Sequence, residues 1–310
     1  MDGQRLQSTV IFRIMKFSFS SPQVVCRPAL PLDRADVFEF TKFIWEGHDY
    51  IRYVWDEWFA DPHGLLAVAE YGGRAVGMAK ITLVSKGQWW LEGFRVDPKV
   101  QGLKVGSRIH EYVNGWWDEY GDGTVRLMTS SERVQVHHLS ERTGFIKVGE
   151  VNSYSAPALD ERTDSFSPVR PDELNTALDF ATASGPYQLD HSLMDIGWTQ
   201  AALDGIFMKQ LIVEEKVFWW RGRDGLFIKW DDEDEDGNTV LGVSLPACRL
   251  EFLPELLTDL RRFAFAKNRV SVFGIVYVNP RIEFALKKAG FRSSWDSTAY
   301  IYERRHPERP

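Results

Sequence analysis

The chain has 310 residues, of which 44% are hydrophobic, so it is long enough for two domains with substantial cores. Acidic residues outnumber basic ones by 44 to 37, and the formal charge of −7 argues against binding to nucleic acid or to an anionic membrane, because both partners need basic surface. The two cysteines, Cys26 and Cys248, are too few and too far apart for a disulfide framework or a zinc site, which favours a cytoplasmic protein.

The N-terminal segment does not resemble a secretory signal. Residues 1–21 lack the basic start, long apolar middle and cleavage pattern of a secretory signal, and no apolar run reaches the roughly 20 residues that span a bilayer. We expect an extension ahead of the first domain, with Met1 or Met15 as the start.

The first half predicts an alternation of helices and strands. Turns at 72–73 and 86–87 indicate a meander of three antiparallel strands. Apolar residues at 109, 112, 113 and 116 indicate a long amphipathic helix. In chain order we expect a strand at 24–29, helices at 33–44 and 53–59, strands at 65–71, 75–84 and 88–96, a helix at 105–120, a strand at 125–130 and a helix at 134–142.

The second half repeats this order less clearly. Residues 169–180 are expected to begin as a strand and continue as a helix. Further strands are expected at 216–222, 225–231, 238–245 and 271–278, and helices at 253–263 and from residue 279. Two Gly-Phe pairs, at 144 and 290, lie 146 residues apart, and the two long helices begin 148 residues apart. A nearly constant offset predicts a duplication, with domains at 22–160 and 166–306.

Other polar clusters carry no strong functional signal. The acidic run Asp231–Asp236 is typical of a solvated hairpin tip, with a cation site as the alternative. His48, His137 and His138 lack the spacing of a metal site or of a catalytic triad. The sequence therefore predicts no metal site.

The most informative segment is Phe94–Val113, FRVDPKVQGLKVGSRIHEYV. A strand ends at Val96, a turn follows, and a loop with Gly102 and Gly106 leads directly into the long helix. A helix N-terminus offers unpaired N–H groups and roughly half a positive charge, and glycines let the backbone approach an anion closely. This order predicts a site for a pyrophosphate.

The segment resembles the acetyl-CoA loop of GCN5-related N-acetyltransferases (GNAT), Val-x-Pro-x-x-(Arg/Gln)-Gly-x-Gly-x-(Gly/Ala). The matching residues are Val96, Pro98, Gln101, Gly102 and Gly106, whereas Lys104 stands at the position of the middle Gly. The resemblance implies a tandem GNAT fold of the α/β (α+β) class, in which helices flank a mixed, mostly antiparallel sheet. It also implies that acetyl-CoA binds to the residues Phe94, Arg95, Val96, Gln101, Gly102, Leu103, Lys104, Val105, Gly106 and Ser107.

The later family motif, often Asn-x-x-Ala-x-x-Leu-Tyr-x-Lys-x-Gly-Phe, matches residues 133–145 in part. Ser140 stands where the family often has the Tyr that protonates the departing thiolate, so Ser140 is a weak candidate for the general acid. In the second half the late motif recurs, but Pro246–Glu255, the equivalent of the loop, contains no glycine. We expect the second copy to be degenerate and to bind no anion.

Glu92 is the candidate general base. It lies on the strand that leads to Val96, where regular alternation would place residues 90, 92, 94 and 96 on one face. Its aromatic neighbours would raise its pKa toward a useful value, although an ion pair with an arginine is the alternative.

The segment Trp45–Gly64 falls where the family builds its substrate side. Together with residues 92–98 it resembles the histidine N-acetyltransferase-like branch, which implies a free amino acid or a similar small amine as acceptor. Asp49, Tyr50 and Tyr53 are candidates to contact an ammonium, and Arg52 to contact a carboxylate.

We therefore expect an acetyl-CoA-dependent N-acetyltransferase that acts by direct transfer on a small-molecule amine, as a monomer or homodimer. Two alternatives remain open: a non-catalytic acyl-CoA-binding or regulatory module, and a peptide or protein N-acetyltransferase.

Overall fold

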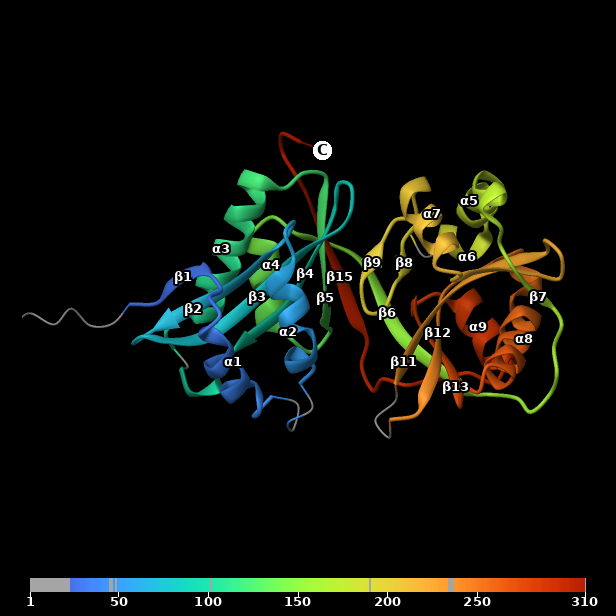
Figure 1. Ribbon diagram of the computed structural model, residues 1–310, viewed down its shortest axis with the longest axis horizontal. Helices are drawn as coiled ribbons and strands as arrows, with labels where there is room; N and C mark the ends of the chain where they lie inside the picture. The colour runs from blue at the N-terminus through green and yellow to red at the C-terminus, as the bar shows by residue number, and fades with distance from the viewer. Residues whose placement is uncertain are drawn as a thin grey trace, which may run out of the picture.

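Strands from both halves of the chain join in one thirteen-stranded sheet with helices on both of its faces (Figure 1). The structure is a computed structural model that describes residues 23–44, 47, 49–100, 102–189, 191–233 and 237–309. The expected extension 1–21, Gln101, His48 and part of the acidic run Asp231–Asp236 lie outside these residues. The observed architecture is the mixed α/β fold that the sequence predicts.

The first half follows the expected order closely, because its turns and amphipathic stripes are strong local signals. Its elements are β1 (Val25–Pro28), α1 (Asp33–Thr41), α2 (Ile51–Ala60), β2 (Leu65–Tyr71), β3 (Arg74–Ser85), β4 (Gln88–Val96), the 3-10 turn η2 (Pro98–Val100), α3 (Val105–Tyr120), β5 (Thr124–Ser130), α4 (Val134–Arg142) and β6 (Ile146–Pro157).

The second half contains the expected elements and several that the sequence did not indicate, namely α6, α7 and the short or terminal strands. Its elements are β7 (Phe166–Pro168), η3 (Pro171–Glu173), α5 (Leu174–Ala183), α6 (Gly185–Leu189), β8 (Met194–Asp195), β9 (Gln200–Ala201), α7 (Gly205–Val213), β10 (Val217–Trp220), β11 (Gly225–Glu233), β12 (Thr239–Cys248), η4 (Leu250–Phe252), α8 (Leu253–Ala266), β13 (Ser271–Tyr277), α9 (Pro280–Lys288), β14 (Arg292–Ser293) and β15 (Ala299–Arg305).

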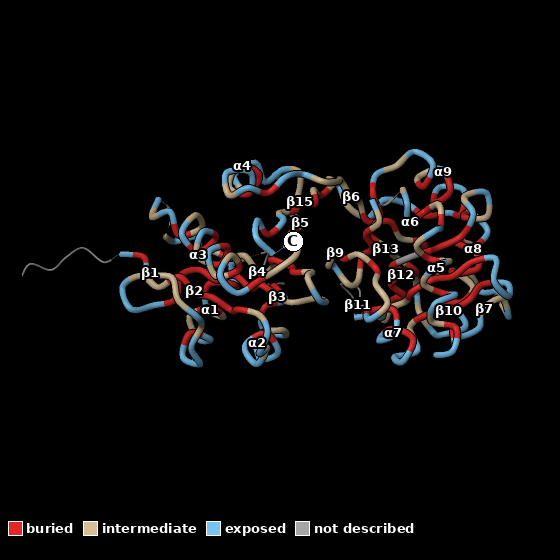
Figure 2. Tube along the Cα trace, turned by 90° about the horizontal axis from the view of Figure 1, so that it is seen from above, coloured by how far each residue is buried: buried red, intermediate tan, exposed pale blue. Residues whose placement is uncertain are grey.

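Each half has a hydrophobic core on both faces of its part of the sheet. In the first half, α3 packs on one face through Val105, Ile109 and Val113, whereas α1 and α2 pack on the other. In the second half, α8 and α9 cover one face, and α5 and α7 cover the other. Figure 2 shows the buried residues concentrated along the strands and the exposed ones on the outer surfaces.

The two halves exchange their last strands. β15, the last strand of the second half, pairs antiparallel with β5 of the first half from Ala299 opposite Ser130 to Arg305 opposite Thr124. β6, the last strand of the first half, lies between β15 and β13 and pairs with both. The sheet order is therefore β4-β5-β15-β6-β13-β12, and neither half has a complete sheet of its own. The division into 22–160 and 166–306 stays a prediction.

The duplication is visible in the element order, with one informative change of offset. The turns η2 and η4 begin at 98 and 250, an offset of 152, whereas α3 and α8 begin at 105 and 253, an offset of 148. The second copy thus lacks four residues between its 3-10 turn and its long helix. These four correspond to residues 101–104, the loop that the sequence assigns to the pyrophosphate.

Because β15 is shared, damage to it should destabilise the whole molecule. Ile301 on β15 is 0% exposed, and we expect Ile301→Ala to lower the free energy of unfolding by about 2–4 kcal/mol, with both halves still unfolding in one transition. Urea unfolding followed by fluorescence and by far-UV circular dichroism measures this. Ile146→Ala, on the neighbouring strand β6 but 63% exposed, is the matched control and should change little. Two separate transitions in Ile301→Ala would contradict a shared sheet.

Candidate active site

The predicted anion site lies at the N-terminus of α3. Lys104 is the N-cap residue, and no side chain among the described residues caps the helix, so the first-turn N–H groups are available to a ligand. Gly102 has φ of 83°, and nothing described lies within 4 Å of where its Cβ would be. The open loop and the uncapped helix fit a pyrophosphate.

Lys104 occupies a conformation that normally favours glycine. Its φ of 56° and ψ of 27° are left-handed, and its side chain is exposed. A side chain in this region costs roughly 1–2 kcal/mol, which accounts for the glycine that the GNAT pattern has at this position. Lys104 therefore carries this strain, and as the N-cap residue it adds a positive charge at the start of the helix.

A wedge opens between β4 and β5, the two parallel strands that flank this helix in sequence. They pair only from Gln88 opposite Thr124 to Trp90 opposite Arg126. Beyond Trp90, β4 continues to pair with β3, and β5 with β15. Residues 91–96 therefore have no strand partner on their β5 side. This is the splayed geometry in which Phe94, Arg95 and Val96 were expected to present backbone groups to acetyl-CoA.

A bulge at Gly93 changes which side chains face the wedge. Met78 lies opposite Arg95 and Lys80 lies opposite Glu92, so β4 carries one extra residue, and Gly93 has φ of 61°. A Cβ at Gly93 would meet the ring of Trp58 at 2.5 Å.

The prediction that residues 90, 92, 94 and 96 share a face is therefore wrong beyond the bulge. Phe94 and Val96 pack toward α3 together with Trp89 and Leu91. Glu92 remains on the opposite face, on the side of α2. The bulge thus separates the cofactor side of β4 from the side that holds the carboxylate.

The Glu92 carboxyl group is hydrogen-bonded to one hydroxyl group and is otherwise largely removed from water. Its Oε1 accepts a hydrogen bond of 2.6 Å from Thr82 Oγ1. Burial raises the pKa of Glu92 to about 7, although the Thr82 hydrogen bond and the nearby Lys80 ammonium both favour the charged form. Lys80 itself is buried and ion-paired with Asp61. The alternative of an arginine partner for Glu92 finds no support among the described residues, and a carboxyl group with this pKa can exchange protons at neutral pH.

The four candidate substrate residues divide into two groups. Asp49 is buried and accepts a 2.6 Å hydrogen bond from Arg95 Nε, so its charge is already paired. The Arg95 guanidinium lies over the ring of Tyr50, 5.4 Å from its centroid, and burial raises the pKa of Tyr50, with a smaller contribution from the nearby Glu92. Arg52 and Tyr53 are exposed on α2, and the Arg52 guanidinium lies over the ring of Tyr53.

The structure thus brings Tyr50 near Glu92 and pairs Asp49 with Arg95, and the substrate-binding roles of these residues stay predictions. Sequence reasoning missed Thr82, Lys80, Asp61 and Trp58. The hairpin turn at 86–87 could have revealed Thr82 and Lys80, because its register places them opposite residues 90–92.

Ser140 is fully buried on α4, and its hydroxyl has no hydrogen-bond partner among the described residues. A buried hydroxyl without a partner is costly, so the position is unusual. Its role as a general acid stays a prediction. His137, also on α4, is held by Ser130, with its Nε2 2.9 Å from the backbone oxygen, which fits a packing role.

Comparison with known proteins places the first half in a family. Residues 33–145 match the profile of the acetyltransferase (GNAT) family. Residues 33–145 are a GNAT acetyltransferase domain. The family transfers acetyl groups and uses acetyl-CoA as co-substrate, so the domain is an acyltransferase domain. A search of the curated proteins found no match in sequence.

The fold of the whole chain resembles solved GNAT structures. A GCN5-related N-acetyltransferase from Sphaerobacter thermophilus is 13% identical with a TM-score of 0.62, over 93% of this chain and 96% of that one. A tandem GNAT protein from the clavulanic acid biosynthesis pathway is 10% identical with a TM-score of 0.55, over 91% of this chain and 98% of that one.

A glucosamine N-acetyltransferase region of a fungal multi-domain β-N-acetylglucosaminidase is 12% identical with a TM-score of 0.68, over 92% of this chain and 38% of that one. These likenesses establish the tandem GNAT fold. The resemblance to the histidine N-acetyltransferase-like branch stays a prediction.

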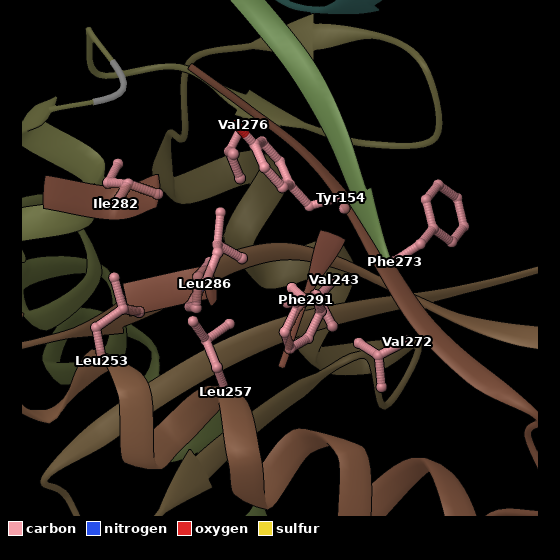
Figure 3. Close-up of a pocket in the computed structure, with 12 residues that line it drawn as sticks. Tyr154, Val243, Leu253, Leu257, Val272, Phe273, Val276, Ile282, Leu286 and Phe291 are labelled. Carbon is pink, nitrogen blue, oxygen red and sulfur yellow. The ribbon is translucent and has the colours of Figure 1, made fainter. Parts of the chain in front are cut away.

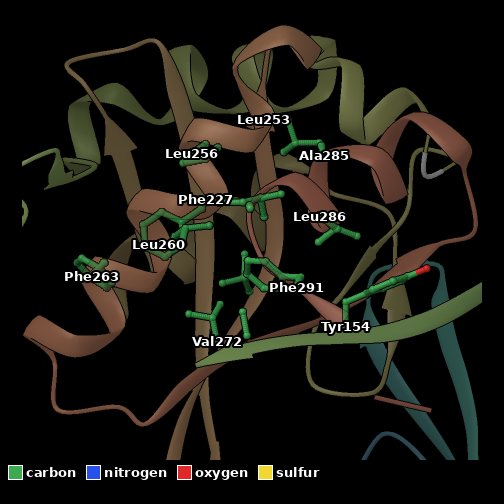
Figure 4. Packing of buried hydrophobic residues seen from close by; sticks show 14 of the residues in the cluster. Tyr154, Phe227, Leu253, Leu256, Leu260, Phe263, Val272, Ala285, Leu286 and Phe291 are labelled. Carbon is green, nitrogen blue, oxygen red and sulfur yellow. The ribbon is translucent and has the colours of Figure 1, made fainter. Parts of the chain in front are cut away.

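The second GNAT-like copy also has two parallel strands that separate, β12 and β13, but side chains fill the space between them. β12 and β13 pair in parallel only at Leu241–Gly242 with Val272–Phe273, and β12 has an irregularity near Ser244. The space that follows is an apolar cavity of only about 20 Å³, room for about one water molecule (Figure 3). Leu253, Leu286 and Phe291 line it from α8, α9 and the segment that follows α9 (Figure 3). The same three residues belong to the packed hydrophobic core of this half (Figure 4). With the loop deleted and the wedge filled, the described part of this copy offers no place for acetyl-CoA.

The cradle assignment can be tested at Gly106. A Cβ there would make an ordinary 3.5 Å contact with Phe94, and an acidic residue in the first helical turn favours the helix dipole, so the fold should tolerate Gly106→Glu. Its carboxylate would repel the pyrophosphate, and we expect at least a hundredfold loss of CoA affinity, roughly 3 kcal/mol, by calorimetry. Gly115→Glu, in open space on the same helix, should leave affinity unchanged. Equal affinity in both variants would remove the cradle assignment.

Proposed function

We propose that the protein transfers the acetyl group of acetyl-CoA directly to the amine of a small molecule, such as a free amino acid, with Glu92 as the general base. The observation that carries the proposal is a carboxyl group whose pKa is about 7, on the strand that borders the wedge. Acetyl-CoA supplies an activated acyl group whose thiolate departs readily.

The residues of the chain divide the work. The N-terminus of α3 binds the pyrophosphate, and the free edge of β4 at 94–96 orients the arm of the coenzyme. Glu92 accepts the proton that the amine nitrogen loses as it bonds to the acetyl carbon, while the carbon–sulfur bond breaks. Thr82 orients the carboxylate. Water or Ser140 returns a proton to the thiolate.

The position of the second half supports a small acceptor rather than a protein. Gln88, in the part of β4 that is paired with β5 before the wedge opens, exchanges two hydrogen bonds with the backbone of Ala202, of 2.6 and 2.9 Å. Ser85 Oγ lies 3.4 Å from Asp204 Oδ2. The end of the β3–β4 hairpin is therefore covered by residues of the second half, which leaves less open surface for a folded protein substrate.

The acceptor class is testable by thiol release. Saturating acetyl-CoA is mixed in turn with free amino acids, polyamines and peptides with free N-termini. The proposal expects release with members of the first two classes and a rate at least tenfold lower with peptides. CoA binding without release for any amine would favour the regulatory module instead, and faster release with peptides would favour the peptide N-acetyltransferase.

Glu92→Gln should remove the base without removing the cofactor. We expect kcat to fall about a hundredfold or more, with CoA affinity by calorimetry unchanged. Glu119→Gln, exposed at the far end of α3, is the matched control and should keep its rate. A normal rate for Glu92→Gln would dismiss Glu92 as the base.

The raised pKa of Glu92 also predicts two pH dependences. A base must be deprotonated, so kcat/KM should rise through pH about 7 and level off above it. Because folding raises this pKa from an ordinary value of about 4.5, the folded state holds a proton that the unfolded state has lost between pH 4.5 and 7, and stability falls as pH rises through this window. Urea unfolding at pH 5 and pH 8 should show a smaller fall for Glu92→Gln than for the wild type. An identical fall would contradict the assignment.

A further inference from the structure

A cavity of about 560 Å³ lies where the two halves of the chain meet. Its walls come from the start of β5, from β15 and β6, and from residues 191–193 and 202 of the second half. Its volume falls within the range of about 300–1,000 Å³ that small-molecule sites occupy. Neither the wedge nor Glu92 belongs to its lining.

The cavity contains a buried guanidinium that is only partly paired. Arg126 is 8% exposed, and its Nε donates to Glu303 Oε2 at 2.9 Å. Its Nη1 donates to Gln88 Oε1 at 3.3 Å. Among the described residues its Nη2 group donates no hydrogen bond. A buried guanidinium with an unused edge is a costly arrangement unless a ligand or water completes it.

The charges at the cavity are unbalanced. Glu303 also accepts a hydrogen bond of 3.3 Å from Arg305 Nε, so one carboxylate serves two guanidiniums. No other carboxylate belongs to the described lining, and His191 and Ser192 add polar groups. The lining therefore has one excess positive charge, which suits a ligand with one negative charge. Guanidinium groups bind carboxylates through paired hydrogen bonds.

The remaining walls are apolar. Val148, Leu193 and Ala202 belong to the lining, and Leu193 is buried in a cluster at the junction of the halves. A ligand that fits both parts has an anionic end and an apolar or flat body. His191 and Ser192 have φ of 55° and 59°, and two successive left-handed non-glycine residues are a strain of the kind found at ligand sites.

We propose that this junction cavity binds a small monocarboxylate with an apolar body, held by Arg126 and Arg305. The site is separate from the acetyl-transfer site. The wedge opens beyond Trp90, toward the end of β5, whereas the cavity lies at the beginning of β5. Gln88, hydrogen-bonded to both Arg126 and Ala202, stands at its border.

The test uses phenylacetate as probe and phenylacetamide as its uncharged counterpart, with binding measured by ligand-observed NMR on the full chain. Phenylacetate should bind with millimolar or lower Kd, phenylacetamide at least tenfold more weakly, and saturating CoA should leave phenylacetate bound. Arg305→Gln should weaken phenylacetate about tenfold, since a charge-assisted hydrogen bond is lost. Arg292→Gln, an exposed arginine on β14, is the control and should bind as the wild type does.

A paired variant, Arg126→Gln with Glu303→Gln, removes both buried charges together and should abolish binding. Circular dichroism verifies the fold of this double variant. If the double variant does not fold, the affinity of Arg305→Gln for phenylacetate decides the test. The proposal is overturned if neither probe binds up to about 10 mM, if both bind equally, if CoA displaces phenylacetate, or if Arg305→Gln binds as tightly as the wild type.

Discussion

The hydrogen-bonded ladder β5-β15-β6-β13 is the constraint on which the rest of the structure depends. Each half supplies its last strand to the sheet of the other, so the strands of the active half are completed by residues 299–305. The wedge between β4 and β5 can stay open because β5 is held along its whole length by β15 on its other edge. An unpaired parallel strand would otherwise be a liability. The shared ladder also fixes the position of the second half, and with it the junction cavity.

The bulge at Gly93 connects the backbone to the chemistry. One extra residue in β4 turns Phe94 and Val96 toward α3 and leaves Glu92 on the other face, opposite Lys80 and next to Thr82. Burial then raises the pKa of Glu92 while the hydroxyl and the ammonium limit the rise. Only a glycine fits at the bulge, because the Cβ of any other residue would clash with the Trp58 ring and because the backbone φ is positive. The bulge at Gly93 thus determines on which face of the sheet the Glu92 carboxyl group lies.

Local patterns in the sequence predicted most of the first half, including β4 at 88–96, α3 at 105–120 and α4 at 134–142, because turns and amphipathic spacing are encoded in neighbouring residues. They could not predict the strand exchange, because pairing between residues 124–130 and 299–305 depends on contacts far apart in the chain. The same limit applies to the site: the anion loop could be found as a motif, whereas the partners of Glu92 depended on a bulge that alternation cannot reveal. Asp49 looked like a substrate ligand, yet it is paired with Arg95 from 46 residues away.

The strand exchange has a consequence for how the chain is made. During synthesis the first half emerges from the ribosome with its motif, helices and loop complete, but β5 lacks its neighbour until residue 305 has left the exit tunnel. Domains of ordinary multidomain chains can fold one after another as they emerge. Here the active half must wait for the last strand, and contacts across such a long separation form slowly. The edge of β5 that β15 later covers is therefore exposed to chaperones and to misassembly while residues 131–305 are synthesised.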